Sequence, residues 1–144
     1  MKGEAVTFKS IYEQLKIAST ATLTTVLKRR GLHYTFMHDV TPLRENSRMA
    51  GTAFTLRYIP CREDLDTGEV DNLTDVQRLA SEQVSEGEVL VVDARGDTRA
   101  GIMGDILSTR VQVRGAAGIV TDGAFRDSPS IAELDIPALS LIHI

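Results

Sequence analysis

The sequence predicts an α/β fold with a parallel βαβ core, and three segments carry this prediction. Residues 88–93 (EVLVVD) and 117–122 (AGIVTD) are short apolar runs that end in an acid, a pattern typical of buried parallel strands. Between them, residues 105–114 (DILSTRVQVR) have an amphipathic helical pattern that Gly115 ends. Strand, helix and strand in this order form a βαβ unit, whose crossover is right-handed in nearly all proteins. The length of 144 residues suits a single domain over residues 1–144.

Two short helices are predicted ahead of this core. Residues 8–18 and 20–30 place apolar side chains at helical spacing, and Ser19 between them can cap the second helix. Gly31 follows the second helix at a position where a left-handed residue is favoured. In the first of these segments, the residues at helical spacing are Ile11, Leu15 and Ala18.

The remaining elements are predicted from the spacing of apolar residues and from the residues that begin or end each segment. Residues 49–59 alternate between apolar and polar side chains, which predicts a half-buried strand closed by Pro60. A helix is expected near 73–84, and Ser128–Pro129 opens another that runs through Leu134, with a strand expected from Pro137. Residues 123–127 are predicted to be loop. The inward residues expected for the 73–84 helix are Leu73, Val76, Leu79 and Ala80.

Composition excludes several classes of protein. The formal net charge is −4, and residues 1–60 hold nine Lys and Arg against four Asp and Glu, too thin a basic excess to predict nucleic-acid binding. Cys61 is the only cysteine, which excludes an internal disulfide framework and a thiolate zinc cluster. No segment approaches the length of a membrane helix, and the first residues lack the apolar region of a secretory signal. A cytoplasmic protein without membrane contact is expected.

The βαβ unit also predicts where a ligand binds. Loops that follow parallel strands emerge at the same edge of the sheet, so residues 94–105 and 122–127 should face one crevice. The first loop ends at a helix N-terminus, whose unpaired N–H groups favour an anion. The crevice is therefore the candidate site.

The residues of these loops suit a chelating acid. Gly101 and Gly104 allow close backbone approach, and Arg126 offers a fork of donors to a carboxylate. Asp105 and Asp127 are hard oxygen ligands for Mg²⁺ or Mn²⁺, so a 2-oxo acid could be held through its keto and carboxylate oxygens. Each feature also has a structural interpretation: a dipole-favoured Asp105, glycines that only shape a loop, a surface ion pair between Arg126 and Asp127, or a helix cap at Asp127 or Ser128.

The segment from Ala100 to Pro137 resembles the RraA-like family. The resemblance rests on an acid, twenty intervening residues and then Arg-Asp, here Asp105 and Arg126–Asp127, together with Gly-x-x-Gly-Asp and the DG-x-x-RD that begins at Asp122. STATLTTVL from Ser19 and GTAFTLRYIPCREDLD from Gly51 are similar to the family as well. That family includes 4-hydroxy-4-methyl-2-oxoglutarate aldolases and regulators of ribonuclease E activity.

The resemblance implies a β/β/α swivelling fold like the phosphohistidine domain, assembled as trimers or hexamers. It implies a divalent-metal lyase that cleaves a 2-oxo acid and releases pyruvate, by retro-aldol cleavage or by decarboxylation of oxaloacetate. Asp127 would bind Mg²⁺ or Mn²⁺ directly, Asp105 would bind it through water and assist proton transfer, and Arg126 would bind the substrate and act in catalysis. Backbone amides of the loop and first helical turn would hold the substrate carboxylate; the residues concerned are Gly101, Ile102, Met103, Gly104 and Leu107.

The resemblance weakens over the last residues, PALSLIHI, so the C-terminal part of the family domain is expected to be missing. The alternative to a lyase is a non-catalytic protein that binds and inhibits a ribonuclease E-type RNase. The sequence GIMG also satisfies the Gly-x-x-Gly of an RNA-binding KH loop, but apolar residues and Asp105 stand where such loops are basic, and this reading is rejected. Phosphate-loop and dinucleotide fingerprints are absent.

Overall fold

The computed structural model describes residues 7–60, 62, 64–65, 68, 71, 73–99 and 101–143. The chain divides into two compact units, Met1–His38 and Asp39–Ile144. Cys61, the single cysteine of the sequence, lies outside the described residues. Within the described ranges, no helix combines the length and apolar character needed to traverse a lipid bilayer.

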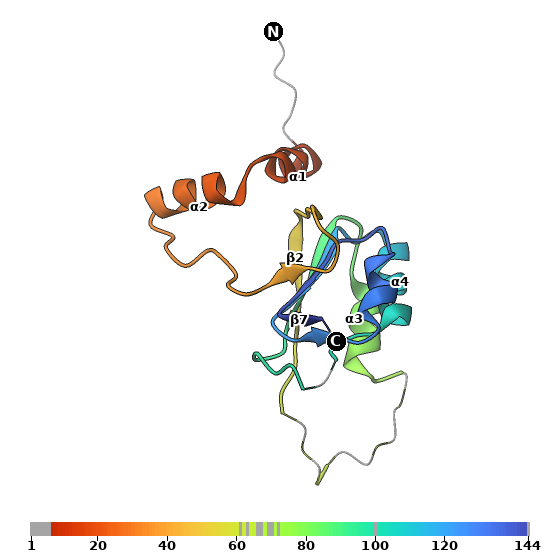
Figure 1. Cartoon of the computed structure of the whole chain (residues 1–144). Coiled ribbons are helices and arrows are strands. Elements are labelled where there is room, and N and C mark those ends of the chain that lie inside the picture. Colours follow the sequence, from red (N-terminus) through yellow and green to blue (C-terminus); the bar gives the residue numbers. More distant parts are fainter. Residues whose placement is uncertain are drawn as a thin grey trace. The chain divides into compact units, whose positions relative to one another are not determined.

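The first unit contains the two predicted helices, α1 (Phe8–Ile17) and α2 (Thr20–Arg29) (Figure 1). Ser19 caps α2 as predicted, because its side chain accepts a hydrogen bond from the backbone N–H of Thr22 at 3.1 Å. Gly31 adopts the expected left-handed conformation with φ of 85°. Ile11 and Leu15, which stand at helical spacing, remain 37% and 38% exposed, and neither helix contains a buried residue. Helical periodicity in a sequence indicates that a helix has an apolar face, but it does not indicate which segment packs against that face.

The second unit is built on a mixed five-stranded sheet with the order β1-β6-β4-β3-β2. Its four parallel strands are β2 (Thr52–Arg57), β3 (Glu88–Asp93), β4 (Gly118–Thr121) and β6 (Ala138–Ser140). The antiparallel β1 (Thr41–Pro42) lies at the edge beside β6. A separate pair joins β5 (Ala124–Phe125) to β7 (Ile142–His143).

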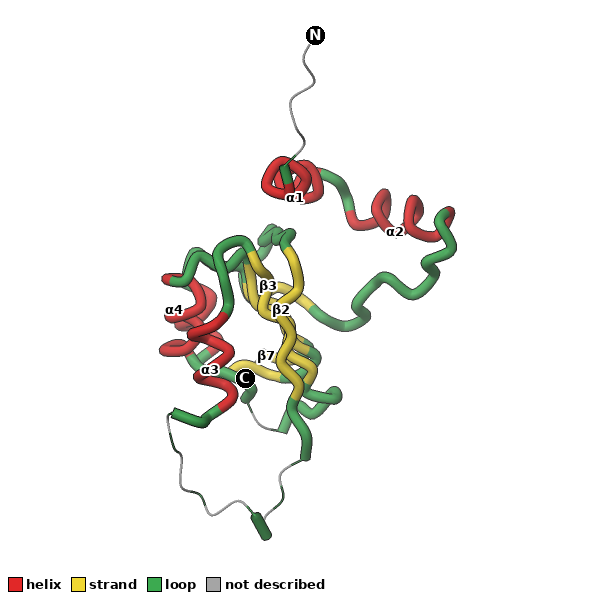
Figure 2. Tube along the Cα trace, turned by 180° about the vertical axis from the view of Figure 1, so that it is seen from behind, coloured by secondary structure: helices red, strands yellow, loops and turns green. Residues whose placement is uncertain are grey.

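Helices connect the parallel strands and pack on one face of the sheet. They are α3 (Val76–Gln83), α4 (Asp105–Val113) and α5 (Ser128–Ala132), and both views place α3 and α4 on the same side of the strands (Figures 1 and 2). Between helices and sheet lies an apolar core that includes Leu90, Val92, Val111, Ile119, Phe125 and Ile131. The predicted βαβ unit is therefore confirmed as β3-α4-β4.

Two differences from the sequence prediction have physical causes. Leu73 and Val76 are 82% and 57% exposed, because α3 begins at Val76 and turns Ala80 rather than these residues into the core. The second difference is that β1, β5 and β7 were not predicted. A two-residue strand has no period to detect, and it forms only where another segment supplies a partner.

Position 51 requires glycine because the backbone of Gly87 lies very close to it. A Cβ atom at this position would lie 2.2 Å from the carbonyl oxygen of Gly87. We expect Gly51→Ala to lower the free energy of unfolding by about 1–3 kcal/mol, because backbone must shift to admit the methyl group. Urea unfolding followed by circular dichroism measures the loss. Ala53→Ser, at an exposed position of β2, is the control and should change stability by less than about 0.5 kcal/mol. An unchanged midpoint for Gly51→Ala would contradict the prediction.

Candidate functional site

The loops that follow β3 and β4 meet at one edge of the sheet, as the βαβ topology predicts. The carboxylate of Asp122 accepts hydrogen bonds from the backbone N–H groups of Ala94 at 2.6 Å and Gly96 at 2.8 Å. Farther along, Ile102 donates its N–H to the carbonyl of Ala124 at 2.7 Å, and Arg126 donates its N–H to the carbonyl of Met103 at 3.0 Å. Four hydrogen bonds therefore join the loop that follows β3 to the loop that follows β4.

The two glycines of the first loop lie directly against the Arg-Asp pair of the second. A Cβ atom on Gly101 would lie 2.1 Å from Cγ of Arg126, and one on Gly104 would lie 2.7 Å from Oδ2 of Asp127 and 3.6 Å from Nη2 of Arg126. The approach to the backbone nitrogen of Arg126, at 2.8 Å, requires glycine at position 101, whereas a side chain at position 104 would displace the ends of the Arg126 and Asp127 side chains. Asp105 follows Gly104 as the first residue of α4 and is half-buried. The three residues to which the resemblance assigns chemistry therefore come from segments that are in contact.

The N-terminus of α4 has no side-chain cap. Thr7, Ser19 and Asp75 cap α1, α2 and α3 through side-chain oxygens, whereas the N-cap of α4 is Gly104 and accepts no such bond. The first N–H groups of a helix have no partner within the helix. Those of α4 consequently point out of the helix beside Arg126 and Asp127, where an anion would be favoured.

Two of the residues that the resemblance assigns to substrate binding have side chains buried in the apolar core. Ile102 and Met103 are 5% and 0% exposed and belong to the apolar core, while Leu107 is partly buried against it. Only their backbone is available to a ligand, as the resemblance requires. The N–H of Ile102 is already used by Ala124, so the amides free of that contact lie from Met103 onward.

Arg126 and Asp127 are exposed and keep their charged atoms unengaged. Within the described residues, neither the guanidinium nor the carboxylate forms a hydrogen bond or ion pair, so the surface ion pair considered as a structural interpretation does not form. Asp127 occupies the N-cap position of α5, yet its side chain caps nothing. Its φ of 56° is left-handed, a conformation that costs free energy in a residue with a side chain and that clusters at functional sites.

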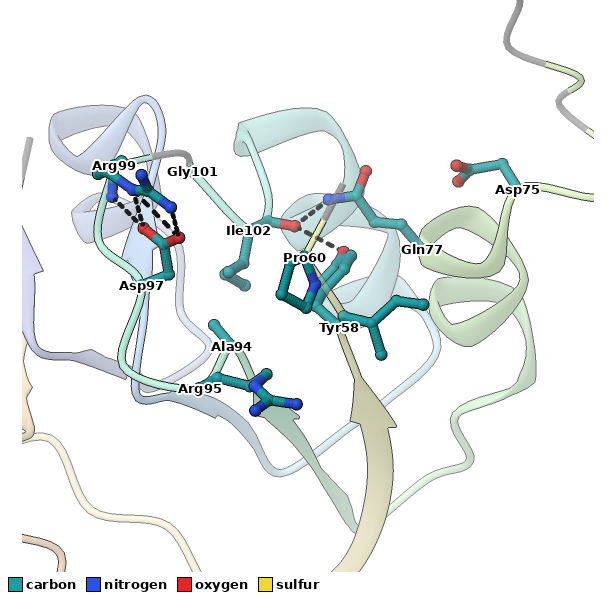
Figure 3. A pocket seen from close by; sticks show the side chains of 11 residues that line it. Tyr58, Pro60, Asp75, Gln77, Ala94, Arg95, Asp97, Arg99, Gly101 and Ile102 are labelled. Atoms are coloured by element: carbon teal, nitrogen blue, oxygen red, sulfur yellow. Dashed lines mark hydrogen bonds and ion pairs between the residues drawn. The ribbon is translucent and has the colours of Figure 1, made fainter. Parts of the chain in front are cut away.

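A cavity of about 710 Å³ opens next to this corner, between the ends of β2 and β3 and the start of α3 (Figure 3). It shares Gly101 and Ile102 with the loop, whereas Arg126, Asp127 and Asp105 are not among its lining residues. The other residues that line it are Tyr58, Ile59, Pro60, Asp75, Gln77, Ala94, Arg95, Asp97 and Arg99. The cavity therefore extends the site away from the Arg-Asp pair.

Tyr58 and Gln77 hold the loop from the cavity side. The Tyr58 hydroxyl donates to the carbonyl of Ile102 at 3.1 Å, and the side-chain amide of Gln77 donates to the same oxygen (Figure 3). Burial raises the pKa of Tyr58 to about 12, although the hydrogen bond with Gln77 opposes the shift and the Asp75 carboxylate adds to it. The hydroxyl thus stays protonated as a donor. Sequence reasoning missed both: Tyr58 has the alternation of a core residue, and Gln77 has no motif.

Two acids in or near the cavity, Asp97 and Asp93, are paired with arginines. Asp97 accepts from the guanidinium and the backbone N–H of Arg99, and these two hydrogen bonds, the side-chain one first, lower the pKa of Asp97 to about 2. Asp93 is bound by Arg57 at 2.7 Å. The acids thus remain ionised at neutral pH and are matched by arginines.

The oxygen donors suit one class of metal. Across the described ranges, no three His, Cys, Asp or Glu side chains gather closely enough to form a metal cluster. A closed zinc site needs four protein ligands and does not fit. Mg²⁺ and similar hard cations bind through one or two carboxylates and keep water and substrate as further ligands. That requirement fits Asp127, whose Oδ2 lies beside Gly104, and Asp105, the next residue after Gly104.

Comparison with known proteins gives a consistent picture. Residues 20–144 match the RraA-like family, described as Aldolase/RraA. A protein of Halalkalibacterium halodurans named "Putative 4-hydroxy-4-methyl-2-oxoglutarate aldolase" is 34% identical over 98 residues, which cover 68% of this chain and 41% of that protein. The chain thus spans less than half the length of this curated relative.

Solved structures agree. Streptomyces coelicolor RraAS2, described as an unusual member of the RNase ES inhibitor RraA protein family, is similar with a TM-score of 0.78 and 34% identity over 92% of this chain and 63% of that chain. The RNA-processing inhibitor RraA from Thermus thermophilis is similar with a TM-score of 0.64 and 28% identity over 88% of this chain and 68% of that chain. The family match takes in both loops of the site, and it confirms the resemblance found in the sequence: the chain belongs to the RraA-like family.

Proposed function

We propose that this protein is a divalent-metal-dependent lyase that cleaves a carbon–carbon bond of a 2-oxo acid and releases pyruvate. One observation carries the proposal: an uncapped helix N-terminus and the Gly101–Gly104 loop lie against an arginine and an aspartate whose charged atoms have no partner in the described part of the chain. That arrangement offers a carboxylate amides, a guanidinium and a place for a cation together. The aldolase name of a relative 34% identical supports the same chemistry.

The roles follow from the positions. Asp127 would hold Mg²⁺ or Mn²⁺ directly and Asp105 would hold it through water, while the amides at the start of α4 receive the substrate carboxylate. When bound, the metal supplies Lewis-acid polarisation of the 2-keto group. As the C3–C4 bond breaks, its electron pair moves to form an enolate, whose negative charge faces the guanidinium of Arg126. Asp105 would assist the accompanying proton transfer. The 4-hydroxyl becomes the carbonyl of the second product in the aldolase reaction, whereas oxaloacetate loses carbon dioxide.

The finer structural assignments are proposals as well. Family membership supports a swivelling β/β/α fold and assembly into trimers or hexamers, as well as a cytoplasmic setting. Sedimentation velocity would measure the assembly, and a chain that remains monomeric at micromolar concentration would contradict it.

A second candidate function is inhibition of a ribonuclease E-type RNase through protein contacts. The observation in its favour is the similarity to RraAS2, which covers nearly the whole chain and which is described within an RNase inhibitor family. The two functions differ in their need for the carboxylates. If the protein is an inhibitor, wild type and Asp127→Asn should slow RNA cleavage by the nuclease equally well. If the protein is a lyase, Asp127→Asn should lose the lyase activity.

Removal of the metal-binding charge should abolish turnover. We expect Asp127→Asn to lower Mg²⁺-dependent pyruvate release from oxaloacetate by about 100-fold or more, because the cation loses its direct carboxylate. Pyruvate formation coupled to lactate dehydrogenase measures it, after subtraction of the rate with Mg²⁺ and no protein. Glu133→Gln is the matched control, since it makes the same chemical change at an exposed position just after α5. Equal rates for wild type and Asp127→Asn would contradict the lyase.

The close approach at Gly104 gives a second test. In Gly104→Ala the new Cβ would lie 2.7 Å from Oδ2 of Asp127, so the carboxylate must move. We expect turnover to fall by about 10-fold or more while the far-ultraviolet circular dichroism stays that of wild type. Thr109→Ala, at an exposed position of the same helix, should keep full activity. Full activity in Gly104→Ala would show that the Asp127 carboxylate does not act from this position.

A further inference from the structure

We propose that Tyr58 and Gln77 are positioning residues of the lyase, which hold the carbonyl of Ile102 and through it set the amides at the start of α4 for the substrate carboxylate. This inference rests on the proposed lyase function and extends it to two side chains outside the Arg126–Asp127 corner. Tyr58 follows β2 and Gln77 is the second residue of α3, so the two donors reach one oxygen from separate elements (Figure 3).

The backbone of Ile102 is held from both sides. Its N–H donates to the carbonyl of Ala124 at 2.7 Å, and its carbonyl accepts from the Tyr58 hydroxyl at 3.1 Å and from the Gln77 amide. The bond to Ala124 joins two backbones and does not depend on any side chain. Within the described residues, the carbonyl has no other donor than Tyr58 and Gln77. These two side chains therefore decide the orientation of the peptide that follows Ile102.

The orientation that they impose leaves the next N–H group without a partner. In a trans peptide the N–H points opposite to the carbonyl, so a carbonyl directed at Tyr58 and Gln77 directs the N–H of Met103 away from them. This N–H has no hydrogen-bond partner in the part of the chain that the structure describes, although Met103 is 0% exposed. A buried N–H without a partner is unfavourable, and a rotation that gave it an acceptor would lower the free energy. The two donors on the carbonyl oppose that rotation.

The start of α4 depends on this orientation because Asp105, its first residue, lies only three positions beyond Ile102. The carbonyl of the intervening Met103 accepts from the N–H of Arg126 at 3.0 Å, so a rotation of the Ile102 peptide would move the helix start relative to Arg126. A displacement of about 1 Å in a site costs about 100-fold in rate. The two donors therefore act on the carboxylate-binding amides through the backbone.

Each donor is itself held in place. The N–H of Tyr58 donates to the carbonyl of Asp93 at 2.9 Å, which extends the pairing of β2 with β3. Burial raises the pKa of Tyr58 to about 12, so its hydroxyl remains a donor. Gln77 belongs to α3, which is linked to α4 by an ion pair between Glu82 and Arg110 at 2.6 Å. Side chains supported in this way position a binding site precisely.

Substitutions that remove only the donors test the proposal. We expect Tyr58→Phe and Gln77→Met each to lower kcat for Mg²⁺-dependent pyruvate release from oxaloacetate by about 10-fold, and the double variant to lower it by about 100-fold. The Mg²⁺ concentration for half-maximal activity should stay within about twofold of wild type, because Asp127, the proposed direct ligand, lies on the other loop. Tyr34→Phe and Gln83→Met make the same changes at exposed positions and should keep full activity.

A variant that regains its donor by protonation separates positioning from a loss of stability. In Gln77→Glu the ionised carboxylate cannot donate to Ile102, so kcat at about pH 8 should fall as in Gln77→Met. Protonation restores a donor, and the ratio of the rates of Gln77→Glu and Gln77→Met should rise about threefold from about pH 8 to about pH 5. The ratio of Gln83→Glu to Gln83→Met should not rise. The other ionisable groups of the cavity are common to both variants and cancel in the ratio; they are Tyr58, Asp75, Arg95, Asp97 and Arg99.

Pyruvate binding separates this inference from the proposed reaction. Isothermal titration calorimetry with pyruvate and Mg²⁺ should show about tenfold weaker binding by the double variant than by wild type. Weaker binding by the double variant, with no pyruvate release by wild type, would support the positioning role while the reaction fails. Turnover that depends on Asp127, with wild-type kcat and affinity in the double variant, would do the reverse. A ratio that does not change with pH, or no pyruvate binding by wild type, would also overturn the positioning role.

Discussion

Contact between two loop backbones is the constraint on which the rest of this site depends. The Gly101–Gly104 segment and the Arg126–Asp127 corner approach so closely that a single methyl group on either glycine would fall within van der Waals distance of the facing side chains. At Gly101 the facing atoms include the backbone nitrogen of Arg126, at 2.8 Å, so a change of rotamer alone would not relieve that contact. The backbone of the Arg126–Asp127 corner is consequently held against the loop.

The surrounding residues act on the same contact from several directions. Asp122 fastens the first half of the 94–104 loop, Tyr58 and Gln77 fasten the carbonyl of Ile102, and the Ile102–Ala124 hydrogen bond joins the two loops directly. Each of these bonds contributes modestly by itself, about 1 kcal/mol for a neutral pair. Together they fix the first helical turn of α4 relative to Asp127, which is the precision that binding of a small acid requires.

The sequence predicted the strand and helix that position the site better than the short strands and side-chain contacts that surround it. Residues 88–93 and 105–113 were placed nearly to the residue, because buried parallel strands are continuous apolar runs and because Gly115 ends the helix. The meeting of the two loops also followed from topology. The short strands at 124–125 and 142–143, the exposure of Leu73 and the contacts of Tyr58 did not follow. The strands and the Tyr58 contacts depend on partners distant in the chain, which no local period or motif indicates, whereas Leu73 is exposed because α3 begins only at Val76.

Left-handed residues also occur away from the site, at Asp39 and Asn46. The coincidence of several unfavourable local features at one edge of the sheet is what indicates a functional site, whichever of the two proposed functions is the correct one. Helices α1 to α3 each have a side-chain cap, as a chain optimised for stability would. At the edge formed by β3 and β4 these preferences are broken together: α4 has no side-chain cap, Arg95 and Asp127 are left-handed, and the charged atoms of Arg126 and Asp127 lack partners within the described residues. Natural sequences tolerate such departures mainly at functional sites. An inhibitor that used another surface would gain nothing from them, whereas a site for a cation and a carboxylate uses each one, and for this reason we favour the lyase.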